Sequence, residues 1–344
     1  MNERMQTSCI ILIAVVFLYP HMSLAQLQKP GIISMASGYL ESARVQPKGH
    51  LYSQITYGYH SSDSKFTTLG FDAMGDIISL DSGNTRVKAP DFTAHTITYH
   101  GAYGITDRLT IFLGVPWIHS KYEFVRRYTD KDGPDGIGDI DIGIKHLITD
   151  NLSGDGIFLS AQVIFKIPEA YDFYYPLTSV SLGDGQYDAE FDLLLGKDWG
   201  RSYTVFQAGF TYRFENTDFD PVTFKPSDEI RILIGGGFNI NSRFAIRGSL
   251  NWIKSLENAE VSDALILSSY TLGGLAWHGD KVLIKDTLGI EQNILNAGVD
   301  AQYDVTNKLG ATIALNKNIK GLDGIGTENA ADITTFSLVL SYVH

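Results

Sequence analysis

The chain has 344 residues and a formal net charge of −12, with its nine histidines counted as neutral. This acidic balance argues against nucleic acid as a partner, because phosphate recognition requires clustered cations. The single cysteine, Cys9, lies close to the N-terminus, so the rest of the chain can form no disulfide.

The N-terminus is typical of a secretory signal peptide. The short apolar run CIILIAVVFLY at residues 9–19 is followed by Ser23 and Ala25, two small residues with the spacing of a cleavage site. The run is too short for a good membrane-spanning helix. Cys9 lies at the start of the run rather than just after it, which argues against a lipoprotein anchor. We therefore expect export and cleavage near Ala25.

Residues 26–48 have little strand pattern, and we interpret them as a periplasmic lead-in or a small plug. From residue 49 onward, apolar and polar residues alternate with the period of two that characterises a strand. The expected strands lie near residues 49–60, 92–103, 109–117, 138–147, 159–167, 186–198, 206–214, 229–240, 243–252, 290–303, 309–317 and 336–343.

The connections between these strands alternate in length. Short turns are expected at residues 105–108, 149–155, 199–202, 241–242 and 304–308, and longer polar segments lie between them. Outer-membrane barrels have short periplasmic turns and long external loops. The fold class is therefore all-β, a transmembrane antiparallel up-and-down barrel of about 12 strands. Fourteen are expected if residues 61–90 or 257–286 hide a hairpin. A soluble β-sandwich should be shorter or split into domains.

The last segment, ADITTFSLVLSYVH at residues 331–344, alternates most clearly. Phe336, Leu338, Leu340 and Tyr342 share one face, which is the lipid face expected for a barrel strand. The segment resembles the C-terminal signal of bacterial outer-membrane proteins, except that it ends in His344 rather than Phe or Trp. Expected partners are the barrel-assembly machinery, outer-membrane lipid, lipopolysaccharide and a small-molecule solute.

Charged residues at inward positions are the candidates for lining the lumen. They are Asp139, Asp141, Lys145, Lys166, Asp188, Glu190, Asp192, Arg213, Arg231, Arg243 and Arg247. Acids on one arc of the wall and bases on the next would create a transverse field that selects solutes by charge. Alternatively, the charges pair across a narrow lumen and hold the wall in shape.

An aromatic cluster in the loop after residue 168 has two interpretations. Tyr171, Phe173, Tyr174 and Tyr175 could form a surface that captures solute, or they could be girdle residues at the outer leaflet.

No enzymatic site is expected. His119–Ser120 is a His–Ser neighbour in the mature chain, but adjacent strand residues point to opposite faces. No HExxH, paired CxxC or P-loop pattern occurs, so we expect no metal and no cofactor. Three aspartates at residues 130, 132 and 135 suggest calcium only superficially, because the terminal Glu of an EF-hand is missing.

The segment GIGDIDIGIK at residues 136–145 resembles the G-x-G-D-x-x-x-G-x-K motif of one family of outer-membrane transporters. That family is named after the meta-pathway of phenol degradation. The resemblance implies a monomeric barrel that passes hydrophobic or aromatic small molecules, with looser similarity to long-chain fatty-acid channels, which carry an N-terminal plug. The motif itself looks structural: its glycines permit close backbone approach or a bulge.

The combined reading is a barrel in the outer membrane of a Gram-negative cell that mediates passive uptake of small molecules. The resemblance favours aromatic or hydrophobic ones. The chief rival is a structural or surface-interaction barrel with a closed lumen, and a lipid-modifying outer-membrane enzyme is third.

Overall fold

The structure is a computed structural model of the whole chain. It describes residues 26–28, 32–34, 43–67, 70–71, 77–79, 84–123, 131–168, 170, 182–183, 185–271, 280–322 and 325–344. The expected signal peptide and the loop aromatics Tyr171, Phe173, Tyr174 and Tyr175 lie outside these residues.

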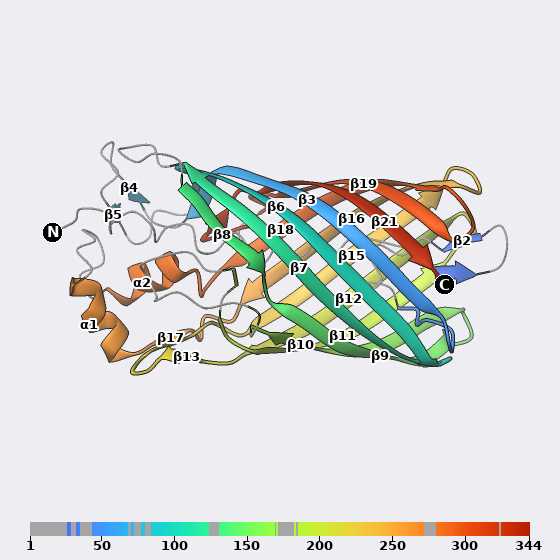
Figure 1. Cartoon of the computed structure of the whole chain (residues 1–344), viewed down its shortest axis with the longest axis horizontal. Coiled ribbons are helices and arrows are strands. Elements are labelled where there is room, and N and C mark those ends of the chain that lie inside the picture. Colours follow the sequence, from blue (N-terminus) through green and yellow to red (C-terminus); the bar gives the residue numbers. More distant parts are fainter. Residues whose placement is uncertain are drawn as a thin grey trace.

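Twelve strands form a closed antiparallel barrel (Figure 1). In chain order they are β3 (Leu51–Thr67), β6 (Thr85–Thr106), β7 (Leu109–Glu123), β9 (Ile140–Leu152), β10 (Ile157–Ile167), β11 (Asp188–Asp198), β12 (Ser202–Arg213), β15 (Glu229–Asn239), β16 (Phe244–Ser255), β18 (Asn293–Asp304), β19 (Leu309–Asn318) and β21 (Thr334–Val343). The ring closes where β3 pairs with both β6 and β21. The expected barrel and its strand count are confirmed, and no hairpin among the described residues is added to the wall.

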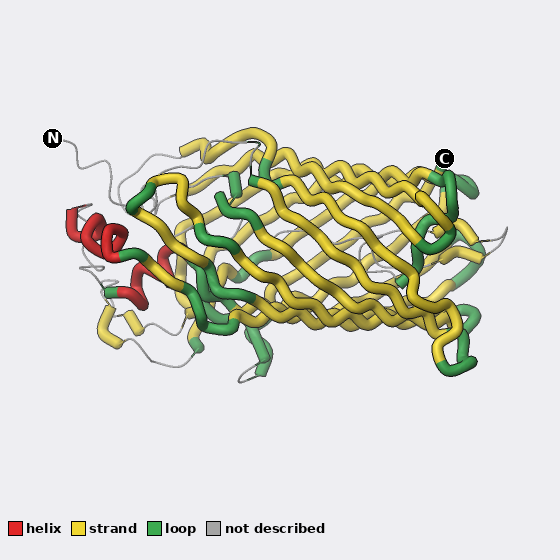
Figure 2. Tube along the Cα trace, turned by 90° about the horizontal axis from the view of Figure 1, so that it is seen from below, coloured by secondary structure: helices red, strands yellow, loops and turns green. Residues whose placement is uncertain are grey.

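The two ends of the barrel differ in how their strands are joined. At one end, which we call the short-turn end, β6–β7, β9–β10, β11–β12, β15–β16 and β18–β19 are joined by tight turns. The C-terminus also lies there, since His344 N donates a hydrogen bond of 2.9 Å to Leu51 O. The long connections gather at the opposite, long-loop end, together with both helices (Figures 1 and 2).

The two faces of the wall follow the sequence alternation. Outward apolar side chains such as Ile55, Leu193 and Leu340 are more than half exposed, at 53, 54 and 57%. Their inward neighbours, including Leu194 and Val339, are buried. A slip of one residue in pairing would exchange the two faces, so the apolar pattern itself specifies the register.

Shorter strands lie outside the ring. β1 (Gln26–Gln28) pairs with β2 (Ile32–Ser34), and β4 (Gly70–Phe71) pairs with β5 (Ile77–Ser79). β8 (Lys131–Ile137) extends the ladder on β7, and β20 (Ala330–Ala331) pairs with β3. β13 (Asn216–Phe219), β14 (Val222–Lys225) and β17 (Glu260–Val261) form a small sheet at the long-loop end.

Two short helices, α1 (Asp263–Thr271) and α2 (Lys281–Leu288), replace the loop expected at residues 257–286. Leu265 N donates to Ser262 Oγ at 3.2 Å, and Val282 N donates to Asp280 Oδ1 at 2.8 Å, so both helices have an N-cap. Gly289, with φ of 60°, follows α2 and ends it. None of the described helices is long and apolar enough to cross a membrane.

Candidate functional site: the lumen and its two mouths

A chain of ion pairs crosses five neighbouring strands inside the long-loop half of the barrel. Lys166 Nζ lies 3.8 Å from Asp139 Oδ2 and 2.5 Å from Asp188 Oδ2. Arg213 continues the chain, with Nε 3.4 Å from Asp188 Oδ2 and Nη1 3.3 Å from Glu229 Oε1. All five residues are buried. The chain ties β10, β11, β12 and β15 to the start of β9.

Three further pairs lie deeper in the lumen. Arg231 Nη1 contacts Glu190 Oε1 at 2.5 Å, and Gln162 Nε2 donates to Asp192 Oδ2 at 2.7 Å. Arg247 pairs with Asp300, its direct neighbour across β16 and β18. Two more candidates, Asp141 and Lys145, are buried on the inward face of β9.

The structure therefore favours mutual pairing of the lumen charges over a separated transverse field. Opposite charges sit on adjacent strands at matching registers, such as Lys166 opposite Asp188 and Asp188 opposite Arg213. One expectation is wrong: Arg243 is exposed in the turn before β16, so it lies at the rim of the short-turn end. The alternation of β16, continued back by one residue, predicts an inward Arg243, but β16 begins only at Phe244.

The GIGDIDIGIK motif has a structural role, as its glycines indicated. A Cβ added to Gly143 would lie 2.4 Å from Cζ of Phe112, whose ring packs against that backbone. Gly138 and Asp139 interrupt the strand between β8 and β9, and Gly138 N donates to Pro116 O at 3.0 Å. The motif thus interrupts the strand before β9 and places Asp139 and Lys145 inward.

Several buried polar atoms face the lumen without a protein partner. Gln162 Oε1, His100 Nδ1 and Gln302 Oε1 make no hydrogen bond within the described part of the chain. An unpaired buried polar atom costs roughly 1–3 kcal/mol, so such atoms are normally hydrated. The interior is therefore suited to water rather than to a dry apolar core.

The long-loop mouth is covered by a lid, which we define as β13, β14, β17, α1 and α2. Its buried apolar residues join inward residues of the wall in one cluster. The members are Phe92, Ala94, Ile118, Leu182, Phe224, Ala259, Leu265, Ile284, Leu288, Ile290 and Ile333. Apolar packing thus attaches the lid to β6, β7 and the segment before β21.

The short-turn mouth is crossed by residues 43–50, which we call the inner segment. Its contacts are with inward-facing residues of the wall: Ser160 Oγ donates to Ala43 O, and Gln46 N donates to Thr110 Oγ1 at 2.8 Å. Arg44 pairs with Asp198, and its guanidinium lies 4.3 Å from the ring centroid of Phe158. These contacts place the inner segment inside the barrel.

A glycine makes room for the inner segment. A Cβ on Gly104 would lie 2.1 Å from Pro47 O and 2.6 Å from Gln46 O. Gly49 N donates to Gly104 O at 2.8 Å, and Gly104 N donates to His50 O at 3.1 Å. The backbone of β6 therefore contacts the inner segment directly, which a larger residue would prevent.

The neighbours His119 and Ser120 do not form a catalytic pair. His119 faces outward, with Nδ1 3.8 Å from Asp135 Oδ2, whereas Ser120 is fully buried on the inward face. The two side chains lie on opposite sides of the wall, as the strand period predicts.

The fold is similar to that of the COG4313 outer membrane channel from Pseudomonas putida F1. The TM-score is 0.63 at 15% sequence identity, and the match covers 88% of this chain and 98% of that chain. At this identity the likeness establishes the fold alone, and it agrees with the barrel that the motif resemblance implied.

Two other solved structures are weaker matches. A Pseudomonas aeruginosa FadL homologue has a TM-score of 0.43 at 12% identity, covering 98% of this chain and 99% of that chain. The P. putida toluene transporter TodX has a TM-score of 0.39 at 10% identity, covering 86% and 90%. Both TM-scores are too low to establish a shared fold. No family model and no curated protein matches the sequence, so membership in the phenol-degradation family stays a prediction.

Proposed function

We propose that this protein is an outer-membrane channel for the passive uptake of small molecules, with aromatic or hydrophobic ones favoured. The observation that carries the proposal is the closed barrel, whose outward face is apolar and whose interior holds charged and unpaired polar groups. A barrel with lipid outside and water inside is the architecture of such channels. The similar P. putida structure, which is an outer membrane channel, supports the same class.

The cellular route follows from the same proposal. The signal peptide is removed near Ala25, and the C-terminal strand β21 is presented to the barrel-assembly machinery of a Gram-negative cell. The protein then spans the outer membrane many times, with the short-turn end in the periplasm. Lipopolysaccharide surrounds the long-loop end.

Passage would involve three successive environments. The lid offers an apolar cluster at the external mouth, the paired charges form a polar layer, and the inner segment narrows the periplasmic outlet. An aromatic acid should pass more slowly than a neutral aromatic, because the charges of this layer are already paired with one another and leave no free cation for its carboxylate. The inner segment acts as a small plug in this scheme.

The test is solute flux in proteoliposomes that contain the refolded mature chain. The panel holds a small sugar, an aromatic acid and a neutral aromatic, with protein-free liposomes as the blank. We expect protein-dependent flux in the order neutral aromatic, aromatic acid, sugar. Glu190→Gln should increase the relative flux of the aromatic acid, because it leaves Arg231 without its carboxylate partner. Lys197→Gln, in the same strand but half-buried near the short-turn end and beside the Trp199 ring, is the control.

A closed structural barrel is the second candidate, and one observation favours it. Both mouths are crossed by packed segments, the lid at one end and the inner segment at the other. Absence of flux for all three solutes, with and without residues 26–48, would support this candidate and refute the channel.

A further inference from the structure

The wall from β9 to β15 carries more carboxylates than cations on its inward face. The inward cations of these strands are Lys145, Lys166, Arg213 and Arg231. The inward carboxylates, counting the residue just before β9, are Asp139, Asp141, Asp188, Glu190, Asp192 and Glu229. Pairing between neighbouring strands cannot neutralise this excess of acids, so the arc has a net negative charge.

Asp192 differs from the acids that belong to ion pairs. Its Oδ2 accepts a hydrogen bond of 2.7 Å from the neutral amide of Gln162. Its Oδ1 makes no hydrogen bond within the described part of the chain, and neither does Oε1 of Gln162. Both side chains are almost completely buried, at 2% exposure each. Two acceptor oxygens therefore lie side by side in the polar layer without a donor from the described residues.

The strand register explains why no cation reaches Asp192. On one side, Gln162 lies between Asp192 and Lys145 in the ladders of β10. On the other side, Gly209 lies opposite Asp192, and a Cβ there would be 2.0 Å from Asp192 Oδ1. The next residue in register is Arg231, whose Nη1 already contacts Glu190 Oε1 at 2.5 Å. The carboxylate thus lies over a bare backbone, between two cations that it does not pair with.

The surroundings of Asp192 increase the negative potential. Glu190 lies two residues earlier on the same face of β11, and the charges of Asp192 and Asp141 both act on it. The side chains of Glu190 and Arg231 are 13 and 11% exposed, so solvent reaches this layer beside Asp192. Carboxylates grouped along a narrow passage with walls of low dielectric constant attract a mobile positive charge.

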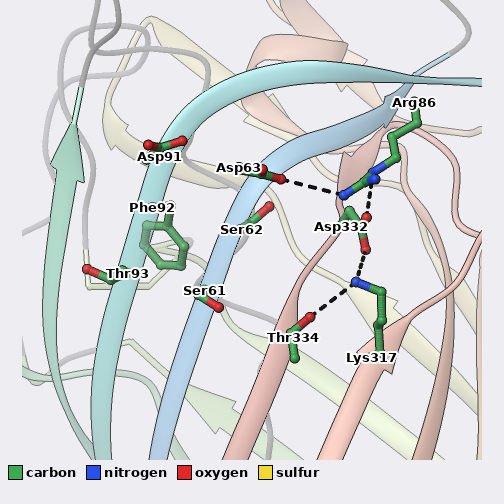
Figure 3. Close-up of a pocket in the computed structure, with 10 residues that line it drawn as sticks. All are labelled: Ser61, Ser62, Asp63, Arg86, Asp91, Phe92, Thr93, Lys317, Asp332 and Thr334. Carbon is green, nitrogen blue, oxygen red and sulfur yellow. Dashed lines mark hydrogen bonds and ion pairs between the residues drawn. The ribbon is translucent and has the colours of Figure 1, made fainter.

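A buried carboxylate elsewhere in the barrel provides a contrast. Asp332, in the break before β21, is also almost completely buried, at 3% exposure. Arg86 Nε lies 2.6 Å from its Oδ2, and Lys317 Nζ lies 3.0 Å from its Oδ1, as Figure 3 shows. The wall thus supplies two cations to Asp332 and, among the described residues, a neutral amide to Asp192. Burying a charge without an opposite charge is costly, so a cation that enters the lumen would relieve this cost at Asp192.

We propose that Asp192 and Gln162 form a cation-selective site in the polar layer, and that the preferred solutes carry an ammonium group. An ammonium group offers a positive charge and N–H donors, which are what two adjacent acceptor oxygens lack. A solute with a carboxylate would bring a further acceptor to a negative region and is disfavoured. Asp192 is then the residue that determines specificity. This inference rests on the proposed channel function and names its solute class.

A metal ion fits the site less well than an ammonium group does. In the described part of the chain, no three His, Cys, Asp or Glu side chains are grouped so that they could hold a metal ion. Hard divalent cations require six or more oxygen ligands in a defined shell. An ammonium group needs only acceptors along its N–H bonds, which Asp192 and Gln162 provide.

Equilibrium binding tests the site without requiring transport. The probe is benzylammonium, and benzyl alcohol and benzoate are its neutral and anionic matches. Each is titrated into the refolded mature chain in detergent micelles and followed by saturation-transfer difference NMR. The wild type should bind benzylammonium about tenfold more tightly than benzyl alcohol, because a charge-assisted hydrogen bond is stronger than a neutral one. Benzoate should bind most weakly.

The decisive variant is Asp192→Asn, which removes the charge and keeps the size of the side chain. Its amide oxygen can still accept the hydrogen bond from Gln162, and heat-modifiable migration in gel electrophoresis verifies that it folds. The tenfold preference for benzylammonium should fall to about one. Asp155→Asn, in the exposed turn after β9, removes one charge elsewhere and should keep the preference of the wild type. An equal preference in wild type and Asp192→Asn would overturn the site, and so would a wild type that does not bind benzylammonium.

Flux in proteoliposomes separates this inference from the proposed channel, with protein-free liposomes as the blank. Benzylammonium should pass faster than benzoate through the wild type, and the ratio should decrease in Asp192→Asn. Binding that depends on Asp192, without flux of any probe, would refute the channel and retain the site. Flux of benzyl alcohol with equal passage of the two charged probes would refute the site and retain the channel.

Discussion

The two mouths of the barrel are closed by different kinds of interaction. At the long-loop end, the lid is attached to the wall mainly through a cluster of buried apolar side chains, with one ion pair between Lys225 and Asp228. At the short-turn end, the inner segment is attached through backbone hydrogen bonds, one ion pair and one cation–π contact. Apolar packing is non-directional and tolerates sliding, whereas hydrogen bonds fix position. The lid can therefore shift against the wall more readily than the inner segment, which hydrogen bonds hold in one place.

The largest effect is expected from breaking the lid's packing. Leu265 and Ile284 are fully buried in the cluster, and each change to alanine should cost about 2–5 kcal/mol of lid packing. In Leu265→Ala/Ile284→Ala, limited proteolysis should cleave residues 256–292 while the strands stay protected. Leu267→Ala, in the same helix but 67% exposed, is the control and should resemble the wild type.

Displacing the inner segment without changing charge is the next test. In Gly104→Ala the new Cβ would clash with the carbonyl oxygens of Pro47 and Gln46, both backbone atoms that cannot rotate away. We expect faster tryptic cleavage after Arg44 or Lys48 and a larger solute flux. Gly101→Ala, on the outward face of the same strand, meets only the side chain of Tyr99 and should change neither. Unchanged cleavage in Gly104→Ala would contradict the tight seating of the segment.

A smaller effect is expected from Arg44→Gln, which leaves the backbone contacts of the inner segment intact. The change removes the pair with Asp198 and the contact with the Phe158 ring. Together these two contacts should stabilise the seated inner segment by about 1–3 kcal/mol, because the guanidinium of Arg44 is largely buried. Tryptic cleavage at Lys48 should increase less than in Gly104→Ala. If the increase were larger, side-chain contacts rather than backbone fit would hold the segment.

The smallest effect is a response of the lid to acid. Burial alone would raise the pKa of Asp228, but the backbone N–H of Arg213 and the side chains of Asn258 and Lys225 hold this pKa below its ordinary value of 3.8. Lys225, at the end of β14 in the lid, has its Nζ 3.0 Å from Asp228 Oδ1 and so joins the lid to the start of β15.

The sign of this response follows from the lowered pKa. The stabilisation is complete above pH 3.8 and is lost as the pH falls through the lowered value. Proteolysis of the lid by an acid protease should therefore increase in this acid range. Asp228→Asn should abolish most of the pH dependence, and an unchanged pH profile in that variant would contradict the role of Asp228.

The sequence predicted the wall well because a strand in a barrel has only two faces. Alternation placed the side chains of residues 336–343 in β21 correctly, and it placed Lys166 and Asp188 inward. Alternation does not tell which charged side chains on neighbouring strands form ion pairs, because that depends on the register between the strands. Strand ends were also missed: Arg243 follows the inward pattern but belongs to the turn.

The two mouths were predicted least well. The signals for both helices were present as the caps Ser262 and Asp280 and as Gly289 after α2. They were obscured because each helix is short and its neighbourhood is rich in turn residues. The inner segment has no periodic pattern at all, because its backbone groups bond to the wall and not to a neighbouring strand. Its position could not be predicted from residue order alone.

The seam between β3 and β21 sets the order in which the barrel can form. Most neighbouring strands in the ring are also close in sequence, so their hairpins need only short loop closures. The seam instead joins Tyr52 to Val343, across almost the whole chain. Contacts of such large sequence separation form slowly. Folding should therefore proceed as an open, growing sheet, and the closing of this single seam should set its rate.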